Sequence, residues 1–416
     1  MQRWLKFAKY LPQFGWYPVI ITPAEGTAPY YDSELLKDVP PEAEVIKTGT
    51  LEPFALYNKL QGKRQGAPVP VGMMDISKPD TAFKKLSAFV RGNVFIPEAR
   101  RGWVPYATKA ALERIKQGDI DIIVSTGPPH STHLGAQKVA RQTGLPWLAD
   151  LRDPWTNIYY NQALPRLELA KKYDRYLETE VVKAASAVTV VSPGMVDEFG
   201  ARAKRIELLY NGFDEDDIPT ERVPSENFVI AHVGNFFPAL ESPGLVQALA
   251  ALCVENKNFS QRLRLEFTGM VDKDVLGRLE KSLPTGSVVV HGPRSHSEAT
   301  QAMVNADLLL LSIANEANSR VLVGGKVFEY LATGHPIVAI GNPESGAADV
   351  LRKAGKGEMM PHDDAAHIKD SILAAFTHWQ SGLGFAKTDS SLITQFSRRG
   401  LTGQLSQLLT ELTAGK

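Results

Sequence analysis

Residues 323–339 of the 416-residue chain read Val-Gly-Gly-Lys-Val-Phe-Glu-Tyr-Leu-Ala-Thr-Gly-His-Pro-Ile-Val-Ala. The paired glycines predict a loop that opens a short helix, and Gly334 with the following proline predicts its end. The apolar residues from Ile337 onward indicate a buried strand. A helix N-terminus carries unpaired N–H groups and partial positive charge, and glycines let a ligand approach the backbone. This stretch therefore predicts an α/β fold in which a helix begins at an anion site.

Two charged side chains follow in the first turn of that helix. Lys326 adds a full positive charge beside the N-terminus, and Glu329 lies about one turn further on. A carboxylate in that position can accept hydrogen bonds from both hydroxyls of a ribose. A phosphate site next to a ribose site predicts nucleotide binding. The same residues are also ordinary helix-start signals, so this pattern alone leaves both interpretations open.

Length and composition place the chain among globular proteins. A length of 416 residues exceeds one hydrophobic core and predicts two or three domains. The hydrophobic content is 44%, the charged content is 22% and the net charge is zero, which argues against a basic surface for nucleic acid. The one cysteine, Cys253, excludes internal disulfides and cysteine-based zinc sites. No apolar run reaches the roughly 18 residues of a membrane span, so we expect a soluble, cytoplasmic protein.

The N-terminal half predicts a helix, a strand and then a regular α/β alternation. Apolar residues at helical spacing predict a helix over 2–13, and residues 19–22 predict a buried strand. The chain thus begins on a helix, without the preceding strand that such units normally have. Strands are then predicted at 120–125, 146–149, 187–191 and 206–210, with helices over 107–116, 131–141, 167–184 and from 192. This alternation indicates a parallel sheet covered on both faces.

The alternation of predicted strands and helices resumes after an acidic, proline-containing segment at 215–227, where we place the domain boundary. Predicted strands at 228–233, 263–268 and 288–291 are each followed by a glycine, namely Gly234, Gly269 and Gly292. Further strands are predicted at 306–312, at 337–340 and around 359, and helices over 365–378 and 401–412. Two Rossmann-like domains of this kind would carry ligand loops at the carboxyl ends of their strands and face each other across a cleft.

The segment between these regular parts, residues 23–101, is irregular and rich in glycine and proline. Between Asn58 and Arg101 there are nine Lys/Arg against three Asp/Glu, interleaved with Phe83, Phe89 and Phe95. A solvated excursion of loops and helices is the simpler interpretation. The alternative is an acceptor-facing or membrane-facing edge, because basic and aromatic residues together suit anionic headgroups.

Six motifs, in their order and spacing, resemble a GT-B glycosyltransferase, similar to family 4, the group called glycosyl transferases group 1. They are RWLK at 3–6, STGPPHS at 125–131, ADLRDPW at 149–155, YNGFD at 210–214, ADLLL at 306–310 and GKVFEYL at 325–331. The resemblance implies two Rossmann-like, doubly wound parallel-sheet domains facing across a cleft, with the first strand of the N-terminal domain missing. The expected domains are residues 1–214 on the acceptor side, 215–388 for the nucleotide sugar, and a helical segment 389–416 that packs back toward the N-terminal domain.

The resemblance also implies the chemistry. Members of this family transfer a sugar from a nucleotide-diphosphate sugar with retention of anomeric configuration and without a metal. For this chain it implies a hexosyltransferase-type enzyme of polysaccharide biosynthesis, whose partners are the donor and a glycan or lipid-linked acceptor, with no other cofactor. Peripheral contact with the inner face of the membrane through residues 58–101 is a further expectation, and no nucleic-acid partner is expected.

Carried over by position, Glu329 matches the family's ribose-binding glutamate, whereas Val321 stands where the family has an earlier glutamate. The arginine and lysine that hold the pyrophosphate in the family, after the first strand of the C-terminal domain, are absent from residues 234–240. Lys326 and Arg294 could supply that charge. The predicted donor-binding residues are Gly234, Gly269, Arg294, Gly325, Lys326 and Glu329.

A second set of candidates follows two strands of the N-terminal half. His130 and His133 come after one strand end, where they could act at the site or simply cap or line the next helix. Asp150 and Asp153 flank Arg152 after the next strand, and a structural Arg–Asp pair is the simplest interpretation. The predicted catalytic residues are His130, Asp153 and Glu329, the predicted acceptor-side residues are His133, Asp150 and Arg152, and no metal site is predicted.

The departures from the family pattern keep two other functions open. Without the arginine–lysine pair and the opening strand, the protein could bind a nucleotide sugar or a partner without catalysis. A nucleotide-sugar epimerase is a further alternative with the same fold.

Overall fold

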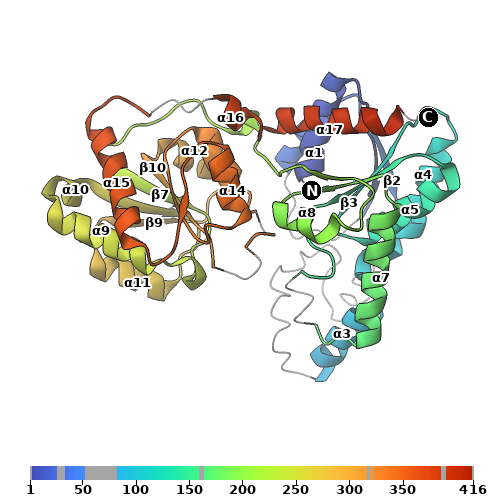
Figure 1. Cartoon of the computed structure of the whole chain (residues 1–416), viewed down its shortest axis with the longest axis horizontal. Coiled ribbons are helices and arrows are strands. Elements are labelled where there is room, and N and C mark those ends of the chain that lie inside the picture. Colours follow the sequence, from blue (N-terminus) through green and yellow to red (C-terminus); the bar gives the residue numbers. More distant parts are fainter. Residues whose placement is uncertain are drawn as a thin grey trace. The chain divides into compact units, whose positions relative to one another are not determined.

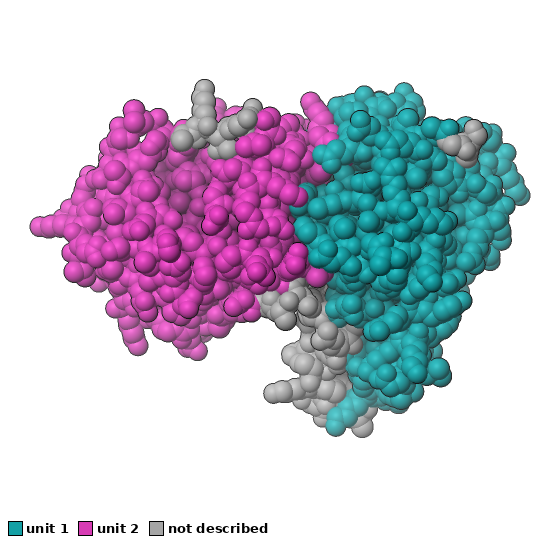
Figure 2. All heavy atoms as spheres, in the orientation of Figure 1, with its two compact units in different colours: residues 1–210, 402–416 teal, residues 211–401 magenta. Residues whose placement is uncertain are grey.

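The computed structural model describes residues 2–25, 33–51, 82–158, 164–315, 319–321, 323–385 and 390–414. The chain divides into two compact units, which are coloured separately in Figure 2. Unit 1 contains residues 1–210 and 402–416, and unit 2 contains residues 211–401. Each unit has its own parallel strands and its own helices.

The larger sheet of unit 1 has four parallel strands in the order β3-β4-β5-β6 (Figure 1). The strands are β3 (Ile123–Gly127), β4 (Trp147–Leu151), β5 (Ala187–Val190) and β6 (Ile206–Leu208). The helices that alternate with them are α4 (Val104–Ile115), α5 (Ser131–Thr143), α7 (Glu168–Ala184) and α8 (Pro193–Phe199). Every residue of β4 and β5 is buried, as their mostly apolar sequences predict.

A second sheet of unit 1 pairs β1 (Val19–Pro23) with β2 (Glu44–Thr48) in parallel. Before it lie α1 (Gln2–Tyr10) and the 3-10 turn η1 (Leu11–Phe14), which ends at Gly15 with a φ of 81°. The helix and the position of β1 are as the sequence predicts, but all residues of β1 are only partly buried, so the expectation of a buried strand there is wrong. Strand β2 lies in the segment that we expected to be irregular. Among the described residues no strand joins this sheet to the larger one. The missing first strand therefore stays a prediction.

The basic segment at 58–101 is only partly described, because residues 52–81 fall outside the described ranges. Its second part forms α3 (Ala82–Asn93) and the 3-10 turn η4 (Ala99–Trp103). The end of α3 is tied to the start of α7, since Asn93 Oδ1 accepts a hydrogen bond from Leu167 N at 2.7 Å and Arg166 Nε donates to Gly92 O at 3.0 Å. No helix in the described ranges is long and apolar enough to cross a membrane.

Unit 2 is built on a six-stranded parallel sheet in the order β12-β11-β10-β7-β8-β9. Its strands are β7 (Phe228–Val233), β8 (Leu263–Thr268), β9 (Val288–Gly292), β10 (Leu308–Ser312), β11 (Ile337–Ile340) and β12 (Met359–Met360). Its main helices are α9 (Pro243–Glu255), α11 (Lys273–Ser282), α12 (His296–Asn305), α13 (Lys326–Thr333), α14 (Gly346–Lys353) and α15 (Ala365–Gln380). All six strands were predicted, so the α/β fold with parallel sheets in two units is confirmed.

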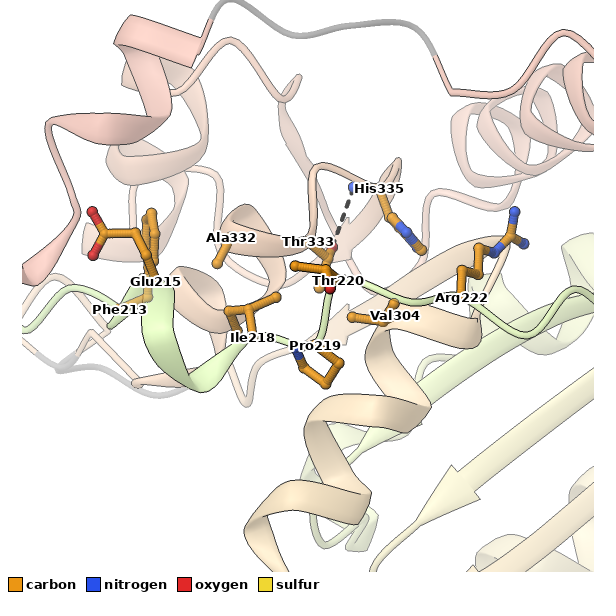
Figure 3. A pocket seen from close by; sticks show the side chains of 10 residues that line it. All are labelled: Phe213, Glu215, Ile218, Pro219, Thr220, Arg222, Val304, Ala332, Thr333 and His335. Carbon is orange, nitrogen blue, oxygen red and sulfur yellow. Dashed lines mark hydrogen bonds between the residues drawn. The ribbon is translucent and has the colours of Figure 1, made fainter. Parts of the chain in front are cut away.

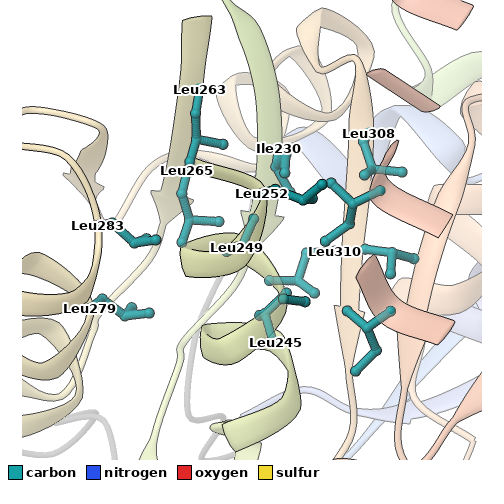
Figure 4. Packing of buried hydrophobic residues seen from close by; sticks show 14 of the residues in the cluster. Ile230, Leu245, Leu249, Leu252, Leu263, Leu265, Leu279, Leu283, Leu308 and Leu310 are labelled. Atoms are coloured by element: carbon teal, nitrogen blue, oxygen red, sulfur yellow. The ribbon is translucent and has the colours of Figure 1, made fainter. Parts of the chain in front are cut away.

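The core of unit 2 lies between this sheet and helices α9, α11 and α15. On α9, Leu245, Leu249 and Leu252 recur at helical spacing and face leucines of the strands (Figure 4). Phe376 of α15 completes the core with an edge-to-face contact to Phe228, whose ring centre is 5.3 Å away. This packing fixes the sheet whose carboxyl edge carries the predicted donor residues.

Candidate functional site

Helix α13 carries two of the predicted site residues in its first turn. Gly325 is its N-cap residue, and no side chain there hydrogen-bonds to the first N–H groups. Gly334 ends the helix with a φ of 74°, and β11 follows. The helix, its terminal glycine and the next strand thus confirm the prediction from residues 323–339. Its exposed N-terminus keeps backbone donors accessible to an anion.

Tyr330 fixes α13 against the sheet. Its buried hydroxyl accepts a hydrogen bond from Val233 N at 2.9 Å and lies 3.4 Å from Leu310 O, to which it donates. Val233 is the last residue of β7, so the first turn of α13 is held beside the carboxyl end of that strand. This is the edge of a parallel sheet where ligands bind in doubly wound folds.

The Lys326 ammonium lies over the carboxyl end of β7. A Cβ atom added to Gly234 would overlap Nζ and Cε of Lys326, and Gly234 has a φ of 118°. The lysine Nζ is 3.4 Å from Nε2 of His232. In the described part of the chain Lys326 forms no ion pair, and its neighbour His232 is a neutral acceptor. A partly buried cation without a paired carboxylate is a candidate for binding an anion.

Glu329 lies three residues further along the same helix. Burial raises the pKa of Glu329, while His296 and Lys326 act in the opposite direction. Burial lowers the pKa of Lys326, and the Glu329 charge partly offsets that effect. The Glu329 carboxylate makes no hydrogen bond or ion pair with any described residue. Both groups are therefore withdrawn from water and open to a ligand that carries phosphate and hydroxyl groups.

The glycines predicted at strand ends line the same edge. Gly234 N donates to Thr268 O at 2.6 Å, and Gly269 N donates to Gly292 O at 2.9 Å. A Cβ atom added to Gly269 would overlap the carbonyl oxygen of Gly234. The close backbone packing at this edge therefore requires glycine, and it brings the predicted residues Gly234 and Gly269 next to Lys326.

Arg294 is placed differently from these residues. It is exposed and lies 3.6 Å from Glu298 on helix α12, in the turn where Ser295 forms a capping box with that glutamate. The structure therefore gives Arg294 a partner on the surface, and its assignment to the donor stays a prediction.

In unit 1, Asp150 at the end of β4 is completely buried and satisfies several donors. Its Oδ1 accepts from Arg3 at 3.1 Å and from Thr189 at 2.8 Å, and its Oδ2 accepts from Trp4 at 2.6 Å and from Thr126 at 2.9 Å. Burial alone would raise the pKa of Asp150, but Arg3 and these hydrogen bonds hold it below the ordinary value. Asp150 thus connects α1 to three strands of unit 1.

Arg152 does not pair with either of its flanking aspartates. Its guanidinium donates instead to the backbone carbonyls of Gly127, at 3.3 Å, and of Pro128. Asp153 is partly buried, and burial raises its pKa against the opposing effect of Arg152. The expected pairing of Arg152 with Asp150 or Asp153 is therefore wrong: Asp150 pairs with Arg3 instead, and Arg152 holds the loop that leads to His130.

His130 and His133 lie close together in a buried cluster with Trp155. The His130 ring stacks on Trp155 with centroids 4.7 Å apart, and the two histidine rings are 6.0 Å apart. Within the described residues, His130 Nδ1 and Nε2 and His133 Nε2 have no hydrogen-bond partner. A Cβ atom added to Gly127 would lie 2.5 Å from His133 Nε2 and 2.9 Å from His130 Nδ1, so the loop needs glycine there.

Two contacts place these histidines. His133 Nδ1 is 2.8 Å from Ser125 Oγ, which also accepts a hydrogen bond from Trp147 Nε1 at 2.8 Å. The backbone N–H groups of His130 and Ser131, at the start of α5, donate to the two oxygens of Glu98 at 3.0 and 3.1 Å. Burial, the largest effect in each case, raises the pKa of Glu98 and lowers that of His133 to about 4. Burial also lowers the pKa of His130 well below its ordinary value, so both histidines are neutral near pH 7.

A separate cavity of about 350 Å³ lies in unit 2, at the opposite end of α13 from Lys326 (Figure 3). One side is formed by the segment from Phe213 to Arg222 and the other by residues of α12, α13 and His335. Arg222 is already paired with Asp307. No residue of the predicted donor or catalytic set lines this cavity.

Comparisons with known proteins agree with this geometry. The profile described as Glycosyltransferase Family 4 matches residues 76–217, and that described as Glycosyl transferases group 1 matches residues 227–378. The chain belongs to the family 4, group 1 GT-B glycosyltransferases. This glycosyltransferase is accordingly an enzyme of the EC 2.4 type. A search of curated proteins finds no match.

Solved structures show the same GT-B fold as this glycosyltransferase. Sucrose-phosphate synthase from Thermosynechococcus elongatus has a TM-score of 0.57 at 14% identity, covering 99% of this chain and 92% of its own. HepE from Anabaena, in complex with UDP, has a TM-score of 0.55 at 15% identity, with 99% and 95% covered. The N-terminal domain of trehalose-6-phosphate phosphatase from Candida albicans has a TM-score of 0.53 at 14% identity, with 95% and 96% covered. At these identities the likeness is one of fold.

Three residues at these sites escaped prediction from the sequence. His232 had a local signal, because it is the one polar residue in the apolar strand Phe-Val-Ile-Ala-His-Val. Trp155 is the last residue of the motif ADLRDPW at 149–155, but nothing local in the sequence indicates that it stacks on His130. Glu98 lies 32 residues before His130 in an irregular segment, so only the folded chain reveals its contact with α5.

Proposed function

We propose that this glycosyltransferase moves a sugar from a nucleotide-diphosphate sugar to a glycan or lipid-linked acceptor, with retention of configuration and without a metal. The observation that carries the proposal is the first turn of α13, where Lys326 and Glu329 are partly buried and lack direct charge partners among the described residues. The diphosphate would bind Lys326 and the helix N–H groups, and the ribose hydroxyls would bind Glu329.

UDP is the first nucleotide that we propose to test. HepE, which shares the fold, is described in complex with UDP. Nothing in the first turn of α13 selects a base, because its ligands would be phosphate and ribose. GDP, ADP and TDP therefore belong in the same test.

In the proposed transfer, negative charge grows on the diphosphate as its bond to the sugar breaks. Fixed positive groups that face this charge lower the barrier, because they need no reorganisation during the reaction. We assign this role to Lys326 and the N-terminal N–H groups of α13. We assign His130 and Asp153 to the reacting sugar and acceptor. His133, Asp150 and Arg152 would hold the loops that carry them, as their buried contacts support.

The direct test incubates the enzyme with UDP-sugars and candidate acceptors in EDTA and follows the anomeric proton of the product by NMR. We expect release of UDP and a first-formed product with the anomeric configuration of the donor. An inverted product would contradict retention, and loss of activity in EDTA that Mg²⁺ restores would contradict metal independence. Conversion of the UDP-sugar to its epimer without UDP release would favour an epimerase.

We further propose that unit 1 contacts an anionic membrane surface, where a lipid-linked acceptor would be located. At the start of α7 and along α3, exposed apolar side chains lie beside exposed basic ones. The apolar residues are Leu86, Phe89, Val94, Leu167, Leu169, Tyr173 and Tyr176, and the basic residues are Lys85, Lys171, Lys172 and Arg175. Aromatic and basic side chains on one surface suit the headgroup region of anionic lipids. We call these eleven residues the α3–α7 surface.

A further inference from the structure

His232 is a completely buried histidine in the middle of the unit 2 sheet, directly below the Lys326 ammonium. Histidine in an otherwise apolar central strand needs compensating hydrogen bonds, because burying a polar group without them is unfavourable. The other five residues of this strand are apolar, so the histidine is the exception in it. The position of this histidine therefore indicates a polar interaction at the end of β7 that an apolar side chain could not make.

The hydrogen bonds of His232 define which ring nitrogen carries the proton. Nδ1 is 3.0 Å from the carbonyl oxygen of Leu310, which can only accept, so Nδ1 carries the proton and donates. The lone pair of Nε2 then faces the Nζ of Lys326 at 3.4 Å, and an ammonium can only donate. Phe236 packs edge-to-face on the imidazole at 4.9 Å and holds its orientation. The imidazole is thus a fixed, neutral acceptor aimed at the lysine.

Neutrality of the ring follows from its surroundings. Burial and then the Lys326 charge lower the pKa of His232 to about 4, against the opposing effect of the Leu310 and Asn235 backbone groups. A carboxylate in the place of this imidazole would also hold the lysine, but it would neutralise the charge that a phosphate needs. A neutral acceptor orients the ammonium and leaves its charge available.

We propose that His232 is a positioning residue that holds the Lys326 ammonium over the end of β7 as the diphosphate-binding cation. This inference rests on the proposed function. Residues 234–240, directly after β7, contain neither arginine nor lysine. The lysine of α13 reaches the same strand end through space, and Gly234 leaves the room that its Nζ and Cε occupy. The loop after β7 therefore needs no cation of its own, because Lys326, positioned by His232 and admitted by Gly234, supplies the positive charge there.

Calorimetric titration of the full chain with UDP and with inorganic pyrophosphate tests the proposal. Lys326→Met is expected to weaken binding of both by about tenfold or more, since it removes a charge-assisted hydrogen bond. His232→Phe, which keeps an aromatic ring but has no acceptor, is expected to weaken both about tenfold. His232→Gln can still donate to Leu310 and accept from Lys326, and it is expected to restore most of the affinity. In the Lys326→Met background, His232→Phe is expected to have no further effect, because its role passes through the lysine.

A second variant keeps the test decisive if His232→Phe fails to fold. Gly234→Ala leaves the imidazole intact and pushes the ammonium off the strand end, so it is expected to weaken binding of UDP and pyrophosphate in the same way. Circular dichroism establishes that each variant is folded before titration.

Three results would overturn the inference. If His232→Phe binds UDP and pyrophosphate as the wild type does, Lys326 does not need His232 to bind the diphosphate. If Gly234→Ala is tested in its place and binds both as the wild type does, Lys326 does not need its place over the end of β7. In either case the proposed function stands and the inference about His232 fails. If His232→Phe weakens binding further in the Lys326→Met background, the histidine acts on the fold and not through the lysine. If the wild type binds no nucleotide diphosphate and no pyrophosphate, both the inference and the proposed function fail.

Discussion

Asp150 is the residue on which the N-terminal helix depends, although its sequence neighbours indicated a site beside Arg152. Its two oxygens accept hydrogen bonds from side chains of α1, β3 and β5, and Arg3 beside it is 3% exposed. Asp150→Asn is expected to destabilise the protein by about 3–5 kcal/mol, because it removes the buried carboxylate charge that Arg3 faces at 3.1 Å. Denaturant unfolding measures this loss. The double variant Arg3→Met/Asp150→Asn is expected to recover part of it, and no recovery would contradict the pairing.

At the residue scale, one local pattern predicted that Lys326 and Glu329 share the first turn of a helix, and the structure confirms that placement, whereas their role toward a donor stays a prediction. Lys326 and Glu329 were identified because a glycine pair, a charge and a carboxylate stand within one helical turn. Arg3 could not be matched to Asp150 from the sequence, because 147 residues separate them and the pairing needs the folded sheet. The assignments of His130, Asp153 and Arg294 depend on a bound substrate, so they stay predictions.

At the scale of elements, helix α5 depends on Glu98 for its first turn. The Glu98 carboxylate accepts from the N–H groups of His130 and Ser131, which have no partner inside the helix. Glu98→Ala is expected to lower stability by about 1–2 kcal/mol, the usual effect of losing an N-terminal cap. Thermal unfolding measures this loss. The matched control is Glu113→Ala, which removes an exposed glutamate that pairs with Lys109 one helical turn away. Equal effects of the two substitutions would contradict a capping role.

Another element-scale prediction concerns the α3–α7 surface. Each basic residue near an anionic membrane contributes about 1 kcal/mol, so replacing Lys171, Lys172 and Arg175 with glutamine is expected to weaken vesicle binding about 100-fold. Co-sedimentation with phosphatidylglycerol vesicles measures this, and pure phosphatidylcholine vesicles are expected to bind weakly. Lys273→Gln with Lys281→Gln, on α11 of unit 2, is the matched control. Equal binding of the wild type to both kinds of vesicle would contradict the proposed surface.

The elements themselves could be predicted wherever the apolar period was long and clear. The six strands of unit 2 and helices such as α7 and α15 follow directly from that period. Strand β2 was missed, because Glu-Val-Ile-Lys-Thr is a short run inside a segment rich in turn residues. Its stability comes from pairing with β1, which a local pattern does not show.

At the scale of the whole molecule, buried histidines make stability depend on pH. Burial, the largest cause in each case, lowers the pKa values of His133, His232 and His335 to about 4 and that of His130 well below 6.5. The unfolded chain binds protons at these residues near pH 6.5, whereas the folded chain resists them. Stability that is fully present above pH 6.5 is therefore expected to fall as the pH drops toward 4.

Melting temperatures between pH 7.5 and 4 check this expectation. His335→Phe removes one such residue outside the proposed site and is expected to flatten the curve between pH 6.5 and 4. Carboxyl groups whose pKa is raised in the folded state, such as Glu98, make stability rise as the pH falls toward 4.5. The difference between variant and wild-type curves is therefore more decisive than the slope of either curve. Identical curves for His335→Phe and the wild type would contradict the assignment.

The most direct test of the donor site is a thermal-shift screen of the full chain with UDP, GDP, ADP and TDP and their common sugar conjugates, repeated on Glu329→Ala. A ligand at 100 times its Kd stabilises the folded state by about 2.7 kcal/mol, which raises Tm by several degrees. We expect one nucleotide to shift the wild type clearly more than the others. Glu329→Ala should retain the unliganded Tm or exceed it, because it removes a carboxylate whose pKa is raised by burial, and it should lose most of the shift. A full shift in Glu329→Ala would contradict the ribose assignment, and no shift in the wild type with any nucleotide would contradict the donor site at α13.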